Sequence, residues 1–499
     1  MKEAIIFILL FCPAIQLAGQ ILKVPTEFST IQQAINQANN GDTIIVDEGT
    51  YKENLVIEDK SIVLCSRFLE SGDEQIISNT ILDGDHMGSV ININSYTARY
   101  SVVINGFTLI NGTRSYGGGI NVGNYSTVLE NLIIKDNIAD YGSGIASWRS
   151  GGRLKIQNTQ VMNNRMNNEA EHDYWGINYG AIWVIGVTED LEIINSKICD
   201  NEGGGINIEI PHWSYYTPYE LYDSTYTKVN IQDTEISNNT GSIGGISIKA
   251  DHTYIKNTEI SKNTAGFDGN GIFIDSDHTI LENVTLCDNV GENDLLFKGF
   301  FEIINSIIWK NRITIRSGDD DYKEEVVGKI EYSDIEYGKD NILKSCRFEY
   351  NEDKKTVEWG NGNLERKPEF VNPEEGDFSL AENSPCIDTG HPDPAYTDRD
   401  GSRNDMGAHE FGTVTHHGKL FSGDAIKLYP NPAGDKVIIT TESTEILTLE
   451  LFDYTGKLIA IERFVSGDQM DIRNLEPGIY LATIKNGSAV VGIKKLIKK

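Results

Sequence analysis

The chain has 499 residues, enough for two or more domains, and it is acidic, with 74 Asp and Glu against 43 Lys and Arg and a formal net charge of −31. This charge disfavours binding to nucleic acid or to an anionic membrane, and it fits a soluble exported protein or one that binds cations. Residues 1–20 contain a lysine, an apolar run and small residues near Gly19, the pattern of a secretory signal peptide. No other run is long and apolar enough to span a membrane. Because of the leader, we expect the mature protein to leave the cytoplasm. We also expect it to be a monomer.

The first predicted element after the leader is a short amphipathic helix over residues 30–39, with Ser29 or Thr30 as its N-cap. Predicted strands follow, beginning with residues 43–46 and 54–57. A helix in this position would cover the open end of a solenoid, which would otherwise expose a sheet edge and an apolar core.

A short sequence motif, which we call the repeated phrase, then occurs eight times between residues 104 and 311. The copy from Ile255 to Asn263 shows the pattern: an apolar residue, Asn two positions later, an apolar residue three after that, and Asn three further on. The copies begin 22 to 38 residues apart, and a fixed phrase with variable filler predicts a solenoid whose turns carry loops of different length. We interpret the asparagines as structural, because Asn tolerates the left-handed backbone conformation at corners and stacked side chains can hydrogen-bond from turn to turn.

Glycine-rich corners follow most copies, as at residues 203–205, and an alternating strand follows each corner. There Ile206 and Ile208 are expected to face the core, with Asn207 and Glu209 facing outward. A phosphate-binding loop is excluded, because no helix follows and the pattern recurs on most turns.

Several stretches match one known fold, namely residues 41–57 near the start and residues 305–309, 332–335, 368–370, 384–390 and 400–410 near the end of the repeats. Over roughly residues 22–411 the chain resembles a right-handed parallel β-helix of the pectin-lyase-like superfamily. The resemblance implies an all-β, single-stranded solenoid over residues 21–411 with an N-terminal capping helix, and a small C-terminal β-sandwich after it. It does not imply an activity, because this superfamily contains lyases, hydrolases, esterases and non-enzymes.

The pattern changes after residues 412–426, which are small and polar and predict a linker. Residues 427–499 hold 10 Lys and Arg and 9 Asp and Glu, so this near-neutral β-sandwich contributes almost nothing to the negative charge. Its KLYPNP opening, LFDYTGK turn, PGIY strand and basic end resemble the C-terminal sorting domain of type IX secretion. That resemblance implies a Bacteroidota-type exporter, binding of residues 427–499 to the type IX machinery, removal of this domain, and a product that is secreted or attached to the outer cell surface.

Two insertions, at residues 165–179 and 211–227, break the rhythm of the repeats. The second holds six aromatic residues, of which Trp213, Tyr215 and Tyr216 are candidate substrate-binding residues. Aromatic rings beside polar groups suit sugars, whose C–H faces stack while their hydroxyls hydrogen-bond. The alternative is that the two loops pack on each other and on the rod.

Between the insertions the alternation predicts an exposed sheet face formed by Trp148, Trp183, Asn207, Glu209, Ser247, Lys249, Phe273 and Asp275. Glu209, Lys249 and Asp275 fall at equivalent positions on consecutive turns and are the candidate catalytic residues. Two carboxylates two turns apart are ~9–10 Å apart at Cα, near the upper end of the spacing in inverting glycosidases. Lys249 could instead be the base of a lyase, or pair with its neighbours. Trp148, Trp183, Asn207 and Phe273 are the further candidates for substrate binding.

Two Asp-His pairs also stack at one corner, and they give the candidate metal ligands Asp251, His252, Asp277 and His278. The alternative is that the aspartates form turns and the histidines are exposed. No cofactor is implied, although Ca²⁺ could bridge an acidic protein and an acidic glycan.

These features favour an extracellular protein that binds polysaccharide, with cleavage of the bound chain as a further activity to test. Two other functions stay open: a non-enzymatic adhesin or structural surface protein, and a calcium-dependent polysaccharide lyase. The motifs of the polygalacturonase-like hydrolases, pectin methylesterases and pectate lyases are not complete in the sequence.

Overall fold

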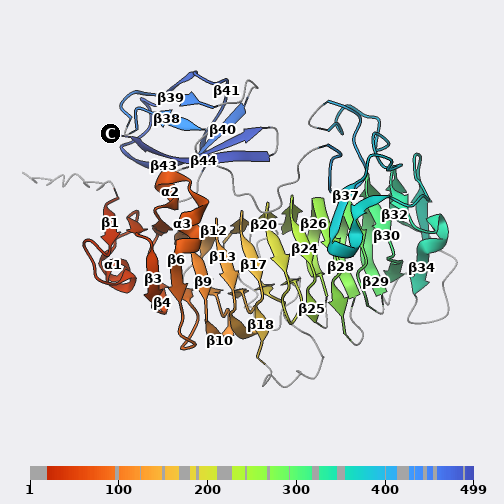
Figure 1. The fold of residues 1–499 in the computed structure, drawn as a ribbon, viewed down its shortest axis with the longest axis horizontal. Helices are drawn as coiled ribbons and strands as arrows, with labels where there is room; N and C mark the ends of the chain where they lie inside the picture. Colours follow the sequence, from red (N-terminus) through yellow and green to blue (C-terminus); the bar gives the residue numbers. More distant parts are fainter. Residues whose placement is uncertain are drawn as a thin grey trace, which may run out of the picture.

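The computed structural model describes residues 19–498 apart from 96–99, 124, 149–151, 168–179, 187–189, 211–226, 242–243, 267–269, 292, 317–324, 346–354, 399–400, 413–425, 432, 442–446, 453–457 and 487–488. The described residues form a rod of parallel strands and a small antiparallel domain at the C-terminal end of the sequence (Figure 1). None of the helices in these parts of the chain is long and apolar enough to cross a membrane.

Each turn of the rod places one strand on each of three faces, and within a face neighbouring strands are parallel and in register. The first face contains β4 (Leu55–Glu58), β7 (Ile91–Asn94), β11 (Ile120–Val122), β15 (Ile145–Trp148), β19 (Ile182–Ile185), β22 (Ile206–Glu209), β31 (Ile313–Arg316) and β34 (Ile342–Ser345). The second contains β1 (Ile21–Val24), β2 (Thr43–Val46), β5 (Ile62–Ser66), β8 (Ser101–Asn105), β12 (Ser126–Glu130), β16 (Leu154–Gln157), β20 (Leu191–Ile194), β23 (Lys228–Gln232), β32 (Glu325–Glu331) and β35 (Lys355–Trp359).

The third face contains β3 (Gly49–Lys52), β6 (Thr80–Asp83), β9 (Thr108–Ile110), β13 (Ile133–Lys135), β17 (Gln160–Met162), β21 (Lys197–Cys199), β24 (Glu235–Ser237), β30 (Ile307–Trp309) and β33 (Asp334–Ile335). Three long strands run on across the corners between faces: β26 (Ile246–Ser261), β28 (Asn270–Cys287) and β29 (Asn293–Ile304). Short strands pair at a further corner: β10 (Thr113–Tyr116) with β14 (Ile138–Tyr141) and β18 (Arg165–Met166), and β25 (Thr240–Gly241) with β27 (Thr264–Ala265). The architecture is the parallel β-helix that the sequence predicted.

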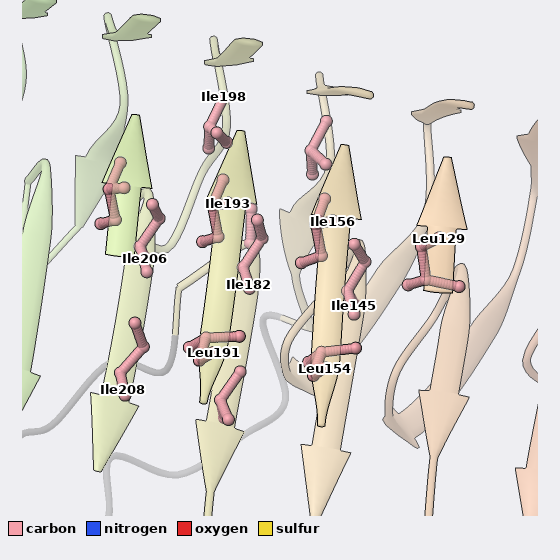
Figure 2. Packing of buried hydrophobic residues seen from close by; sticks show 14 of the residues in the cluster. Leu129, Ile145, Leu154, Ile156, Ile182, Leu191, Ile193, Ile198, Ile206 and Ile208 are labelled. Atoms are coloured by element: carbon pink, nitrogen blue, oxygen red, sulfur yellow. The ribbon is translucent and has the colours of Figure 1, made fainter. Parts of the chain in front are cut away.

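The interior of the rod is one continuous stack of aliphatic side chains. Leu154, Ile156, Leu191 and Ile193 are fully buried and lie in register on neighbouring strands, as Figure 2 shows. Each turn therefore buries its apolar residues against the same residues of the next turn, so the stack is stable only as a series of turns.

The end of the rod is covered by α1 (Ile31–Gln37), as predicted. Thr30 is its N-cap and accepts a hydrogen bond from the main-chain N–H of Gln33. Ile31 and Ile35 are buried against the first strands, so this helix closes the apolar core at the N-terminal end. Two shorter helices, α2 (Phe68–Ser71) and α3 (Glu74–Asn79), lie between β5 and β6.

The two asparagines of the repeated phrase have different structural roles. The first occupies the left-handed region, with φ 55° at Asn131 and 46° at Asn257, as predicted. At the second, the prediction is wrong: the left-handed residue is the one before the Asn, for example Asn238 (φ 55°) and Lys262 (φ 54°). The second Asn is instead buried inside the corner.

The buried asparagines form a hydrogen-bonded ladder along the rod, which confirms the predicted stacking. We call this the asparagine ladder; its members are Asn137, Asn164, Asn201, Asn239, Asn263, Asn289 and Asn311. From Asn164 onward, each amide oxygen accepts from both the main-chain N–H and the side-chain Nδ2 of the Asn one turn earlier, as Asn239 does from Asn201 at 3.2 and 2.9 Å. The ladder satisfies polar groups at a corner that water does not reach.

After the last turn the chain doubles back along the third face. We call residues 377–412 the returning segment; it begins with β37 (Asp377–Leu380), which pairs with β36 (Phe370–Asn372). His409 lies on Glu259 of β26 with 2.6 Å between Nε2 and Oε2, and both side chains are buried. Two described 3₁₀ turns precede the returning segment in the sequence, η1 (Gly338–Asn341) and η2 (Pro373–Glu375).

The C-terminal domain is a small β-sandwich. One sheet is β38 (Lys427–Tyr429), β39 (Lys436–Thr440) and β42 (Gln469–Asp471), and the other is β41 (Leu458–Phe464), β40 (Leu447–Phe452), β43 (Gly478–Asn486) and β44 (Ala489–Lys498) in spatial order. The two sheets share a separate apolar core, so this domain folds around its own buried residues.

Candidate functional site

The first face carries the residues that the sequence singled out, and their register is the predicted one. Ala146, Trp183 and Asn207 align on neighbouring strands β15, β19 and β22, while Ile182 and Ile206 beside them point into the core and are fully buried. The period of two therefore aims the predicted residues away from the core.

Four aromatic side chains gather outside this face. We call Tyr116, Tyr141, Trp148 and Trp183 the aromatic cluster. The rings of Tyr116 and Tyr141 stack with centroids 4.8 Å apart and 15° between planes, and Tyr116 stacks on Trp148 at 5.6 Å and 12°. Trp183 lies 5.1 Å from Tyr141 at 47°. The indole of Trp148 is 44% exposed, whereas Trp183 is only 5% exposed, so Trp183 supports the cluster from within.

Glycines at the corner after β10 and β14 position the two tyrosines of the aromatic cluster. Tyr116 and Tyr141 are the last residues of β10 and β14 and lie in register. Gly117 and Gly142 follow them with φ of 64° and 60°, and a Cβ on Gly117 would lie 2.3 Å from a backbone oxygen. Only glycine allows this reversal. The sequence reasoning missed both tyrosines, although Tyr precedes the corner glycine in three successive turns, the third being Tyr179, outside the described residues.

The predicted catalytic residues continue along the same face as a row of charges. Glu209 aligns with Lys249, Lys249 with Asp275, and Asp275 with Lys298 on β29. Asp275 is held by Lys298, with 2.8 Å between Nζ and Oδ2. Lys298 also lies 5.4 Å from the ring centre of Phe273.

Glu209 and Lys249 differ from Asp275 in having no such partner. Across the described part of the chain, neither side chain makes a hydrogen bond or an ion pair. Lys249 is exposed and Glu209 half-buried. Asp275 is thus engaged in an ion pair, whereas Glu209 and Lys249 have no such partner among the described residues.

Other predicted binding residues are less accessible than expected or lie outside the description. Asn207 and Ser247 point outward but are buried, at 6% and 8% exposure. Trp213, Tyr215 and Tyr216 lie in residues 211–226, which the structure does not describe. Most of the other insertion, residues 168–179, is also outside the described residues.

The four candidate metal ligands stack one turn apart, with His252 aligned to His278. Their ligand atoms do not converge. Asp251 accepts a hydrogen bond from the main-chain N–H of Thr227 at 2.8 Å, and His278 lies 3.0 Å from Glu302. No three of these side chains come within metal-binding range of one another.

In the described chain, three metal-ligand side chains do converge in the returning segment, where oxygens of Asp388, Asp398 and Asp405 lie within 4.8 Å of one another. Burial, followed by the charges of Asp405 and Glu410, raises the pKa of Asp398 to about 7. Carboxylate oxygens of this kind suit Ca²⁺ or Mg²⁺. They are also bound by the protein itself, because Asp405 accepts the N–H of Asp388 at 2.7 Å and Asp398 accepts the amide of Asn404 at 2.8 Å.

Comparison with known proteins identifies the C-terminal domain. Residues 427–499 match the family model for the secretion system C-terminal sorting domain. The protein is therefore exported by the type IX route and is secreted or displayed at the cell surface. No curated protein matches the chain.

Solved structures similar to the chain are parallel β-helix proteins. Pectate lyase Pel9A shares 11% identity over 79% of this chain and 97% of its own, with a TM-score of 0.38. A polygalacturonase from Erwinia carotovora ssp. carotovora shares 13% over 70% and 96%, with a TM-score of 0.34. The PL6 family alginate lyase AlyGC shares 13% over 84% and 60%, with a TM-score of 0.42. Likeness at this level carries no argument about activity.

Proposed function

We propose that this exported protein binds extracellular polysaccharide on the first face of the rod, with the aromatic cluster as the place where a sugar ring stacks. The observation that carries the proposal is the exposed indole of Trp148, backed by the stacked rings of Tyr116 and Tyr141. A large aromatic surface is normally buried, and here it is held rigid and left open to solvent.

The row of charges supports binding along the rod. Turns of the rod repeat every ~4.8 Å, which is close to the length of one sugar unit, so a glycan laid across the strands would meet one residue of the row per turn. Trp148 aligns with Ile185, and Ile185 with Glu209, so Glu209 is two turns from the indole and Lys249 three. Their uncommitted charges are suited to hydrogen-bond the hydroxyl or acidic groups of the same chain.

Cleavage is the second candidate. It is favoured by the observation that Glu209 and Lys249 lie on the outward side of the first face and have no hydrogen-bond or ion-pair partner among the described residues. It would require a carboxylate or an amine to transfer a proton in the bound complex. The pairing of Asp275 with Lys298 makes Asp275 the weakest of the three candidates.

A glycan array with the full chain tests binding. We expect wild-type protein to bind one class of polysaccharide and Trp148→Ala to lose at least about tenfold in affinity, or ~1.4 kcal/mol. The matched control is Tyr337→Asn, which removes another exposed ring, 58% exposed, at a left-handed position that Asn tolerates. Binding by neither protein, or equal binding by wild type and Trp148→Ala, would refute the proposal.

Product analysis separates binding from cleavage. With a bound glycan in hand, new reducing ends or unsaturated products would show hydrolysis or elimination, and Glu209→Gln and Lys249→Met should each abolish them. Unchanged glycan after long incubation leaves a binding protein, and activity that survives both substitutions excludes this catalytic pair.

A further inference from the structure

Strand β41 is at the edge of the four-stranded sheet of the sorting domain, and its exposed side chains are unusual. Ile459, Ile461 and, just beyond the strand, Val465 are 39%, 58% and 40% exposed. Among the described residues of this domain, Tyr429 is the one other large apolar side chain that is exposed. Three of the four exposed large apolar side chains that the structure describes in this domain thus lie on or next to one edge strand.

Strand β41 exposes branched apolar residues on its solvent face, while its core face is only partly apolar. On the core face Phe464 is buried and Ala460 packs against the core, but Glu462 lies opposite the buried Leu449 of β40. Facing solvent, β41 places Ile461, which is aligned with Glu450. Natural edge strands avoid exposed branched apolar residues because they invite pairing with another strand.

An ion pair borders Ile461 on the side away from the edge. Glu450 beside Ile461 pairs with Lys485 of β43 at 2.9 Å. The isoleucines lie at the rim of the sheet, where their side chains are placed to contact a strand added at the edge.

The opposite edge of the sheet is not equivalent. There Lys498 of β44 forms an isolated parallel bridge with Ala433, in the connection between β38 and β39, and Lys498 is 9% exposed. In the described part of the domain, β41 is the edge of this sheet that has no strand beyond it. Its main-chain N–H and C=O groups along that edge are available to a partner.

We infer that the type IX export machinery binds the sorting domain by adding one of its own strands to β41, which buries Ile459 and Ile461. The occupant follows from the identity of the domain, since a sorting domain is recognised by the machinery that exports it. Main-chain hydrogen bonds would supply affinity, and the two isoleucines would supply selectivity, as in other cases of strand addition. This inference goes beyond glycan binding and is tested by a separate readout.

Export of the full chain from a host that carries type IX secretion tests the inference. The double variant Ile459→Ser/Ile461→Ser is expected to reduce the exported fraction at least tenfold, while folded precursor accumulates inside the cell. Val56→Ser is the matched control, because Val56 is an exposed branched residue on strand β4 of the rod, at 38% exposure. The control should be exported as wild type is.

A second measurement covers the case in which the double variant fails to fold. A photo-reactive residue at position 461 of an otherwise unchanged chain should crosslink during export to an outer-membrane component of the type IX machinery, identified by mass, and one at position 56 should not. Export of a folded double variant at more than half the wild-type rate overturns the inference. So does the absence of any such crosslink at position 461 during active export.

Discussion

Replacing one buried residue of the asparagine ladder should destabilise the rod far more than replacing its exposed neighbour. The side chain of Asn239 accepts from the main-chain N–H and Nδ2 of Asn201, at 3.2 and 2.9 Å, and donates to the carbonyl of Ile198 and to Oδ1 of Asn263, both at 2.9 Å. Asn239→Ala leaves at least one buried N–H without a partner and breaks the ladder on both sides. At 1–3 kcal/mol for each buried group left unsatisfied, we expect a loss of roughly 2–5 kcal/mol.

Urea-induced unfolding followed by circular dichroism measures this loss, and the adjacent residue supplies the control. Asn238 is exposed and has φ 55°, so Asn238→Gly keeps the backbone conformation and removes no buried hydrogen bond. We expect it to change the free energy of unfolding by less than about 1 kcal/mol. If Asn239→Ala costs no more than Asn238→Gly, the ladder does not hold the turns together and the reasoning is refuted.

Three further predictions follow from single contacts. Glu259→Ala removes the buried carboxylate that lies 2.6 Å from Nε2 of His409, so the returning segment should loosen by about 1–3 kcal/mol and be cut faster by a protease, and an unchanged rate would contradict a stabilising role for this contact. The raised pKa of Asp398 means that its folded state binds a proton more tightly than the unfolded chain. Wild-type stability should therefore fall as pH rises from about 4 to 7, and Asp398→Asn should be more stable than wild type by up to about 4 kcal/mol at pH 8 and equal near pH 4, measured in chelator; a constant difference would contradict this. Gly112→Ala would put a Cβ 1.8 Å from the carbonyl oxygen of Gly118, so we expect a loss above about 3 kcal/mol or no folded protein, which a thermal melt would show.

The sequence predicted the fold because the repeated phrase encodes it directly. The apolar residue three positions after the first Asn, as at Ile134, Ile198 and Ile260, is fully buried, since spacing alone determines which way a strand residue points. The sequence did not reveal which residue turns the corner. Lys262 adopts the left-handed conformation although nothing about lysine favours it, because the buried Asn that follows fixes the backbone.

The site was predicted in part, for a physical reason. Alternation shows that Trp183 and Trp148 point outward, but it says nothing about what another turn places over them. Tyr116 and Tyr141 come from a different corner of the rod, and they leave Trp183 covered and Trp148 open. Contacts between distant parts of the chain escape such reasoning altogether, as His409 and Glu259 show at a separation of 150 residues.

The asparagine ladder also has a direction. In each turn the ladder Asn donates through its main-chain N–H and its Nδ2, and the amide oxygen of the Asn in the next turn accepts both hydrogen bonds. Every contact between turns therefore has its donors on the N-terminal side and its acceptor on the C-terminal side. Removing one whole period, such as the 24 residues that separate Asn239 from Asn263, would rejoin a donor side to an acceptor side and shorten the rod by one turn without leaving a mismatched joint. The number of turns can therefore change in evolution by whole periods, while the two ends of the rod and the sorting domain stay the same.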